Sequence, residues 1–222
     1  SAASDVYKRQ SLASVTVFVL LIGWKKCLKD CITNRTATED KAMIEWNILR
    51  DKAHANSVRH GFWENNPSDQ HFLCLVISEL MEAVEADRKG DYAGKDMKKL
   101  FEDDLASGED FKGLFESHLK DTVEDELADA AIRLLDLAGA HNLNLNRLCL
   151  KHVVTPRKTF TENIFAIVKD LVNYKYSQEE QVNYALHQIR RLSEIMGFNL
   201  EWHIEQKMRY NESREVKHGK KY

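Results

Sequence analysis

The sequence has few residues that end helices or cross-link a fold. Its 222 residues include two prolines, nine glycines and four cysteines. Proline and glycine interrupt helices, so their scarcity, together with long apolar patterns of 3.6-residue period, predicts an all-α protein. No stretch alternates polar and apolar residues for long enough between turn residues to predict a sheet.

The cysteines and histidines form no recognised disulfide or metal pattern. The cysteines lack CxxC spacing, so we expect reduced thiols in a cytoplasmic protein. The nine histidines are scattered singly, without the HExxH string of a zinc hydrolase. A ferritin-like di-iron bundle needs two Glu-x-x-His helices. The sequence has one such string, Glu215-Val-Lys-His218.

The chain also lacks a strong imbalance of charge. It has 32 basic and 35 acidic residues, a formal net charge of −3. A nucleic-acid-binding protein, or one attracted to an anionic membrane, usually carries a basic excess. We therefore expect neither a nucleic-acid partner nor a membrane surface.

The first 42 residues differ in character from the rest. No methionine precedes Met43, and residues 12–24 form an uncharged apolar run that is too short for a typical membrane span. Residues 27–32 offer no convincing signal-peptide cleavage site. We expect residues 1–42 to be a non-native or disordered extension, with a membrane anchor as the alternative, and residues 43–222 to form one all-α domain.

Apolar spacing and cap residues predict a bundle of about five to six main helices. In the first of these, Ile44, Ile48, Ala53 and Val58 are expected to face inward. Residues 145–197 contain two helices that we expect to form an added hairpin, interpreted as a helical insertion. The expected main helices cover residues 44–60, 69–89, 121–140, 161–174, 178–196 and 199–214, with shorter helices at 97–105 and 111–119.

Two acidic pairs are the centre of the functional prediction: Glu79-Leu-Met-Glu82 and Glu126-Leu-Ala-Asp129. Three residues of helix advance about 4.5 Å and turn about 300°, so both carboxylates of a pair face nearly the same way. Two facing pairs would supply four carboxylates to one hard divalent cation. The alternative is that they are solvated faces of surface helices. Both pairs lie in apolar runs, however, where buried like charges are costly without a cation.

A basic stripe lies near the C-terminus. Lys207, Asn211 and Arg214 fall at helical positions i, i+4 and i+7, and Lys220 follows them. Arginine binds phosphate oxygens in a fork and lysine acts as a point charge, so this stripe suits a polyphosphate. The alternative is an ordinary solvated helix end, where cations also favour the helix dipole.

Together these residues resemble the MazG-like all-α nucleoside triphosphate pyrophosphohydrolases. The resemblance covers roughly residues 44–140 and 198–222, although Ser78 stands where the family commonly has a further glutamate before the first pair. It rests on the strings Ser78-Glu-Leu-Met-Glu-Ala83, Glu126-Leu-Ala-Asp-Ala130, Lys207-Met-Arg-Tyr-Asn-Glu-Ser-Arg214 and His218-Gly-Lys-Lys-Tyr222.

The resemblance implies a homodimeric or homotetrameric helical hydrolase of nucleotide metabolism. Its reaction would be Mg²⁺-dependent cleavage of a nucleoside or deoxynucleoside triphosphate to the monophosphate and pyrophosphate, with Mn²⁺ as a substitute metal. It implies that the metal-binding and catalytic residues are Glu79, Glu82, Glu126 and Asp129, and that the substrate-binding residues are Lys207, Asn211, Arg214, Lys220 and, as a base-stacking residue, Trp63. The alternative is a non-catalytic helical module that binds nucleotide or protein.

Overall fold

The computed structural model describes residues 37–146, 156–175 and 177–219. The chain divides into two units, residues 1–44 and 45–222, and the description below concerns the second. The predictions for residues 1–36, for the segment around residues 147–155 and for Lys220 lie outside the described residues, as does that for the side chain of Ile44. Residues 37–42, part of the predicted extension, belong to a described helix.

The described residues are helical and contain no strand, which confirms the all-α prediction. They form eight α-helices and one 3₁₀-helix, more than the five to six main helices expected, because two shorter helices add to six long ones. The elements are α2 (Ala37–Arg59), α3 (Asp69–Lys89), α4 (Met97–Ala106), α5 (Phe111–His118), α6 (Val123–Ala140), α7 (Phe160–Asn173), α8 (Gln178–Met196), α9 (Leu200–Glu212) and η1 (Val216–Gly219).

Local capping residues set several of these helix ends. The Ser68 side chain accepts the backbone N–H of His71 at the start of α3, and Gly90 ends that helix with a left-handed φ of 79°. The predicted capping box at Ser177 opens α8. These short-range contacts explain why the bounds of α3 and α8 follow from the sequence, whereas α2 begins at Ala37, seven residues before its predicted start.

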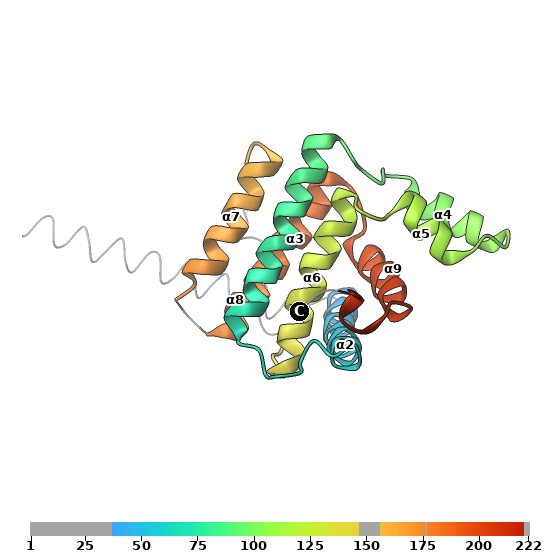
Figure 1. Ribbon diagram of the computed structural model, residues 1–222. Coiled ribbons are helices and arrows are strands. Elements are labelled where there is room, and N and C mark those ends of the chain that lie inside the picture. Colours follow the sequence, from blue (N-terminus) through green and yellow to red (C-terminus); the bar gives the residue numbers. More distant parts are fainter. Residues whose placement is uncertain (1–36, 147–155, 176, 220–222) are drawn as a thin grey trace, which may run out of the picture. The chain divides into compact units, whose positions relative to one another are not determined.

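The helices α3 and α6 lie side by side at the centre of the unit, with α7 against α3 and α9 along α6 (Figure 1). Their apolar faces share one core with α7 and α8, to which Ile164, Ile167 and Ile189 contribute. The α7–α8 hairpin therefore completes the core of the bundle. Among the described residues, no helix is long and apolar enough to cross a membrane.

The buried face of α2 differs from the predicted one. Ile48 is 46% exposed and Val58 is 50% exposed, so their inward assignment was wrong, whereas that of Ala53 is confirmed. The buried face instead continues through two polar residues, Asn56 and His60. The apolar part of this face, formed by Trp46, Leu49 and Ala53, is short because polar side chains occupy the rest of it.

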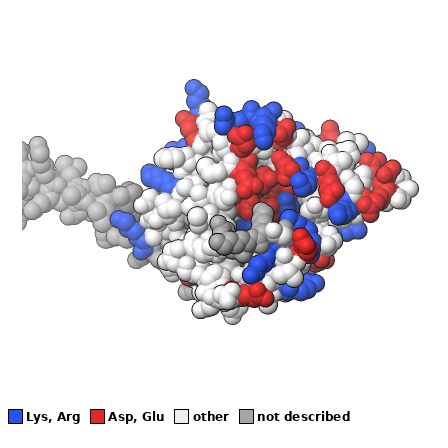
Figure 2. All heavy atoms as spheres, in the orientation of Figure 1, with Lys and Arg blue, Asp and Glu red and all other residues white. Residues whose placement is uncertain are grey.

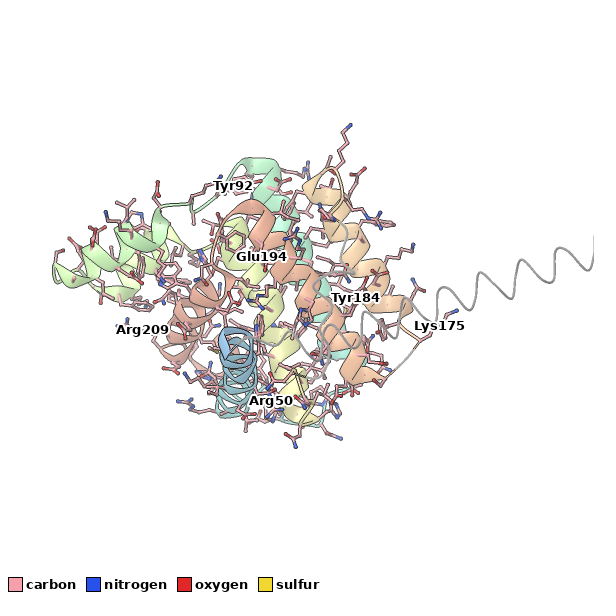
Figure 3. All side chains as sticks on the ribbon, turned by 180° about the vertical axis from the view of Figure 1, so that it is seen from behind. Arg50, Tyr92, Lys175, Tyr184, Glu194 and Arg209 are labelled. Carbon is pink, nitrogen blue, oxygen red and sulfur yellow. The ribbon has the colours of Figure 1, made fainter. Side chains whose placement is uncertain are left out.

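A second, smaller cluster of aromatic residues joins α4 and α5 to α9. Phe115 stacks on Tyr210 with ring centroids 4.3 Å apart, and Phe101 meets Trp202 edge-on at 5.6 Å. Arg209, labelled in Figure 3, lies over the Phe111 ring at 3.9 Å. The connection between α3 and α6 is thus held against α9, the helix that carries the basic stripe.

Candidate metal and phosphate site

Three of the four predicted metal ligands converge between α3 and α6. Glu79, Glu126 and Asp129 each offer a carboxylate oxygen, and these oxygens lie within 4.8 Å of one another. Glu79 and Glu126 are buried and Asp129 is half-buried. Opposite ligands of an octahedral Mg²⁺ site are about 4.2 Å apart. Small rotations of these side chains would therefore bring them to the spacing that a divalent cation needs.

Glu82, the fourth predicted ligand, is not brought into this cluster. It is exposed, and its carboxylate accepts a hydrogen bond from Ser78 Oγ at 3.3 Å. The offset of about 60° between helical positions i and i+3 explains the difference. Glu79 lies on the buried face of α3, and Glu82 lies beyond the edge of that face.

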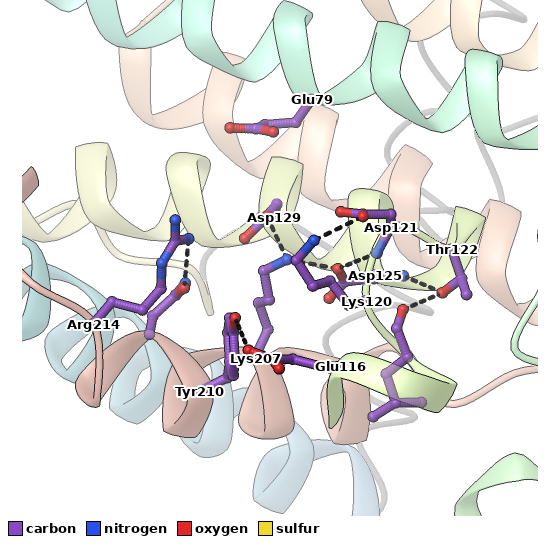
Figure 4. A network of polar contacts seen from close by, with 12 residues as sticks. Glu79, Glu116, Lys120, Asp121, Thr122, Asp125, Asp129, Lys207, Tyr210 and Arg214 are labelled. Atoms are coloured by element: carbon purple, nitrogen blue, oxygen red, sulfur yellow. Dashed lines mark hydrogen bonds and ion pairs between the residues drawn. The ribbon is translucent and has the colours of Figure 1, made fainter. Parts of the chain in front are cut away.

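Lys207 reaches from α9 to the acidic face of α6 (Figure 4). Its Nζ lies 2.6 Å from Asp125 Oδ2 and 2.8 Å from Asp129 Oδ2. Burial acts to lower the pKa of Lys207, but the carboxylates of Asp129 and Asp125 outweigh it, so the pKa is raised and the ammonium stays charged. The predicted phosphate-binding lysine is therefore a direct neighbour of the predicted metal cluster.

Asp125 is a site residue that the sequence interpretation did not include. It is almost fully buried and accepts the backbone N–H of Asp121, a residue in the left-handed region at φ 63°. Burial raises the pKa of Asp125, and the Lys207 ammonium acts in the opposite direction. Its position four residues before Asp129, on the same face of α6, could have pointed to it.

The pKa of Glu126, a carboxyl of the metal cluster, is raised. Burial, followed by repulsion from Asp129, raises its pKa to about 8. Lys207 pairs with Asp125 and Asp129, and Arg133 pairs with Glu79. A divalent cation among the clustered carboxyls would offset the repulsion from Asp129 that helps to raise the pKa of Glu126.

Arg133 occupies the next turn of α6. Its Nε and Nη2 both lie 3.1 Å from Glu79 Oε1, and its guanidinium sits 5.4 Å from the centroid of the Phe62 ring. Figure 2 shows acidic side chains gathered over α6 with basic side chains beside them. The site is thus an acidic patch with cations on its border.

The rest of the basic stripe follows Lys207 along α9. Asn211 is buried one turn later, and Arg214 Nη1 donates to Asn211 Oδ1 at 3.5 Å (Figure 4). Because α9 ends at Glu212, Arg214 lies two residues beyond the helix that was expected to include it. Its main-chain oxygen contacts His60 Nε2 at 3.1 Å, which ties the end of the stripe to α2.

Trp63 lies in the connection between α2 and α3 and is half-buried. Its Nε1 donates to Asp136 Oδ1 at 2.8 Å. Its ring stacks on Phe72 with centroids 4.1 Å apart. Asp136 follows Asp129 by two turns of α6, so the candidate stacking residue and the acidic cluster are attached to the same helix.

Comparison of the chain with protein-family models, curated proteins and solved structures finds no match. The functional assignment therefore depends on the site itself and on the sequence strings that it contains.

Proposed function

We propose that the protein is a Mg²⁺-dependent nucleoside triphosphate pyrophosphohydrolase of the MazG-like all-α kind. One observation carries the proposal: carboxylates from two adjacent helices converge within 4.8 Å, and a buried lysine from a third helix contacts one of them. Carboxylates that hold a metal next to a cation are a common way to bind nucleotide phosphates. The sequence resemblance supports the same conclusion.

Glu79, Glu126 and Asp129 would hold the divalent cation. When bound, the cation would supply Lewis-acid chemistry, polarising phosphate oxygens and lowering the pKa of a water ligand. Rotation of the exposed Glu82 would add a fourth carboxylate.

The remaining steps belong to the chain's own residues. A site carboxylate would take a proton from water as the water oxygen bonds to the α-phosphorus, and the bond from that phosphorus to the bridging oxygen would break. Lys207 and Arg214 would offset the charge that develops on the departing pyrophosphate. Asn211 would position phosphate or sugar, and Trp63 would stack on the base.

The test is pyrophosphate release from a panel of canonical and modified nucleoside triphosphates, with Mg²⁺, with Mn²⁺ and with EDTA. Metal-dependent release of pyrophosphate and an equal amount of monophosphate is expected.

Glu79→Gln and Glu126→Gln, which keep the shape of the side chain and remove its charge, should abolish turnover. The matched control is Glu85→Gln, since Glu85 is exposed on α3 and pairs with Arg88 and Lys89 of the same helix. Full activity in both site variants would refute the assignment.

A non-catalytic module is the second candidate, and the ion pairs favour it. Lys207 already contacts Asp125 and Asp129, and Arg133 contacts Glu79. Such a network can serve structure alone. A folded wild-type protein that shows neither turnover nor Mg²⁺ binding in calorimetry would favour this candidate.

A further inference from the structure

A second buried carboxylate on α6, Asp136, is fully hydrogen-bonded. Its Oδ1 lies 2.8 Å from both His54 Nδ1 and Trp63 Nε1, and its Oδ2 accepts from Ser57 Oγ at 2.6 Å. Asp136 as a whole residue is 2% exposed. Burying a charged carboxylate is costly unless hydrogen bonds from the protein replace those that it makes with water. Asp136 therefore fixes all three donors to α6.

A glycine allows this arrangement. A Cβ at Gly139 would lie 2.4 Å from His54 Cβ, so α2 and α6 can approach this closely only where one residue has no side chain. Gly139 is one turn beyond Asp136, and the close approach brings His54 and Ser57 into reach of its carboxylate.

Of the three donors, Trp63 is the one that the proposed function assigns to substrate binding, as a residue that stacks on the base. One face of its indole lies on Phe72, at 4.1 Å between centroids with planes 20° apart. His54 meets the ring edge-on at 5.2 Å. Within the described part of the chain no second aromatic ring is stacked on the indole, and Trp63 is half-buried rather than enclosed. The connection that carries it contains Asn65 and Asn66, both with positive φ.

The spacing along α6 relates this ring to the acidic cluster. Asp136 follows Asp129 by seven residues, which is about 10.5 Å along the axis on nearly the same face. An extended nucleotide has its base at one end and its phosphates at the other. Phosphates near Asp129 and a base near Trp63 would fit that order.

On the basis of the proposed function, we propose that Asp136 is a positioning residue for the base of the substrate, acting through its hydrogen bond to the Trp63 indole. Without the hydrogen bond to Asp136, the indole of Trp63 could rotate about its side-chain torsions. Held by Asp136, the ring is already oriented for stacking, and less conformational entropy is lost when the base binds.

The experiment measures kcat and KM for the best triphosphate with Asp136→Ala, Asp136→Asn, Trp63→Phe and the Asp136→Ala/Trp63→Phe double variant. Asp136→Ala should raise KM about tenfold, the loss expected for one charge-assisted hydrogen bond, with kcat changed less. Asp136→Asn keeps an acceptor for the indole N–H and should recover most of the lost affinity. In the double variant, Asp136→Ala should add nothing to the effect of Trp63→Phe.

Two further measurements separate positioning from general stability. Mg²⁺ affinity in calorimetry should be the same in all four variants. Asp69→Ala is the matched control, because Asp69 also bonds a histidine and an amide, His141 and Gln178, and has no hydrogen bond to Trp63. If Asp136→Ala does not fold, replacing Trp63 with 3-benzothienylalanine, which has fused rings without the N–H, should raise KM in the same way.

An unchanged KM in Asp136→Ala, or effects that add fully with Trp63→Phe, would overturn the positioning role while leaving the proposed reaction intact. Absence of turnover in the wild-type protein would instead overturn the proposed function, and this inference with it.

Discussion

Lys207 Nζ and Asp125 Oδ2 lie 2.6 Å apart, although their residues are 82 positions apart in the chain and both are buried. Asp129 shares the same ammonium at 2.8 Å. Because Asp125 is not a member of the three-carboxylate cluster, it can keep the lysine in place if Asp129 binds a metal. The pair thus joins the structural network of the bundle to its candidate site.

Removing one partner of this buried pair should destabilise the fold. Lys207→Met leaves Asp125 and Asp129 without their cation, and we expect a loss of about 3 kcal/mol in the free energy of unfolding. Lys98→Met is the control, because Lys98 and Glu102 form an exposed pair at 3.9 Å, worth about 1 kcal/mol at most. Urea denaturation at pH 7 measures both. Equal losses in the two variants would show that the buried pair contributes nothing beyond a surface pair.

The close approach of α2 and α6 predicts an unusual cost for alanine at Gly139. A Cβ there would lie 2.4 Å from His54 Cβ and 3.1 Å from the backbone oxygen of Arg50. The helices must separate, so Gly139→Ala should lower the free energy of unfolding by about 1–3 kcal/mol, although alanine favours helices.

Gly113→Ala in α5 is the matched control. Its nearest atom is Asp110 Oδ2 at 3.5 Å, and it should stabilise by up to about 1 kcal/mol. Thermal unfolding of both variants measures the difference, and stabilisation by Gly139→Ala would contradict the geometry.

Acid should destabilise the protein through His203. Burial lowers the pKa of His203 from 6.5 to about 4, because the charged imidazolium is disfavoured among Trp202 and Phe198. In the unfolded chain His203 takes up a proton near pH 6.5, while the folded protein keeps it neutral. The stabilisation is therefore complete above about pH 6.5 and falls as the pH approaches 4, by up to about 3 kcal/mol.

His203→Phe should remove this part of the pH dependence, since the phenyl ring keeps the edge-on packing and does not titrate. Urea midpoints at pH 7.5 and pH 5 compare the variant with the wild-type protein. The same replacement at His141, which is 39% exposed at its side chain, serves as the control. Parallel pH profiles for wild-type and His203→Phe proteins would rule out the histidine as the cause.

The sequence was sufficient for the elements of the fold because their ends depend on neighbouring residues. Ser68 and Ser177 cap helices through side chains that bond within three residues, and Gly90 supplies a left-handed C-cap. The register of α2 depends on tertiary packing instead. Its buried face runs through Trp46, Leu49 and Ala53 to two polar residues, Asn56 and His60, so its apolar part is short.

In the candidate site, too, some features follow from the sequence pattern and others depend on tertiary packing. The convergence of Glu79 with Glu126 and Asp129 was predictable because two apolar helices with acidic pairs must bury their faces against each other. The exposure of Glu82 and the burial of Asp125 depend on the rotation of α3 and on the position of α9. Those quantities are set by side-chain packing between helices, so the sequence pattern alone did not reveal them.

Metal addition should stabilise the folded protein if the three carboxylates hold a cation. A ligand that binds only the native state adds about 2.7 kcal/mol at one hundred times its dissociation constant. We therefore expect Mg²⁺ to raise the melting temperature, EDTA to reverse the rise, and Glu126→Gln to abolish it, because that variant removes one of the clustered carboxylates. Glu85→Gln, at an exposed position on α3, should keep the full response.

Differential scanning calorimetry with Mg²⁺, Mn²⁺ and Na⁺ at equal ionic strength separates specific metal binding from the screening of charges that repel one another. An equal rise with Na⁺ would mean that the acidic cluster is only screened, and the ion-pair network would then be structural.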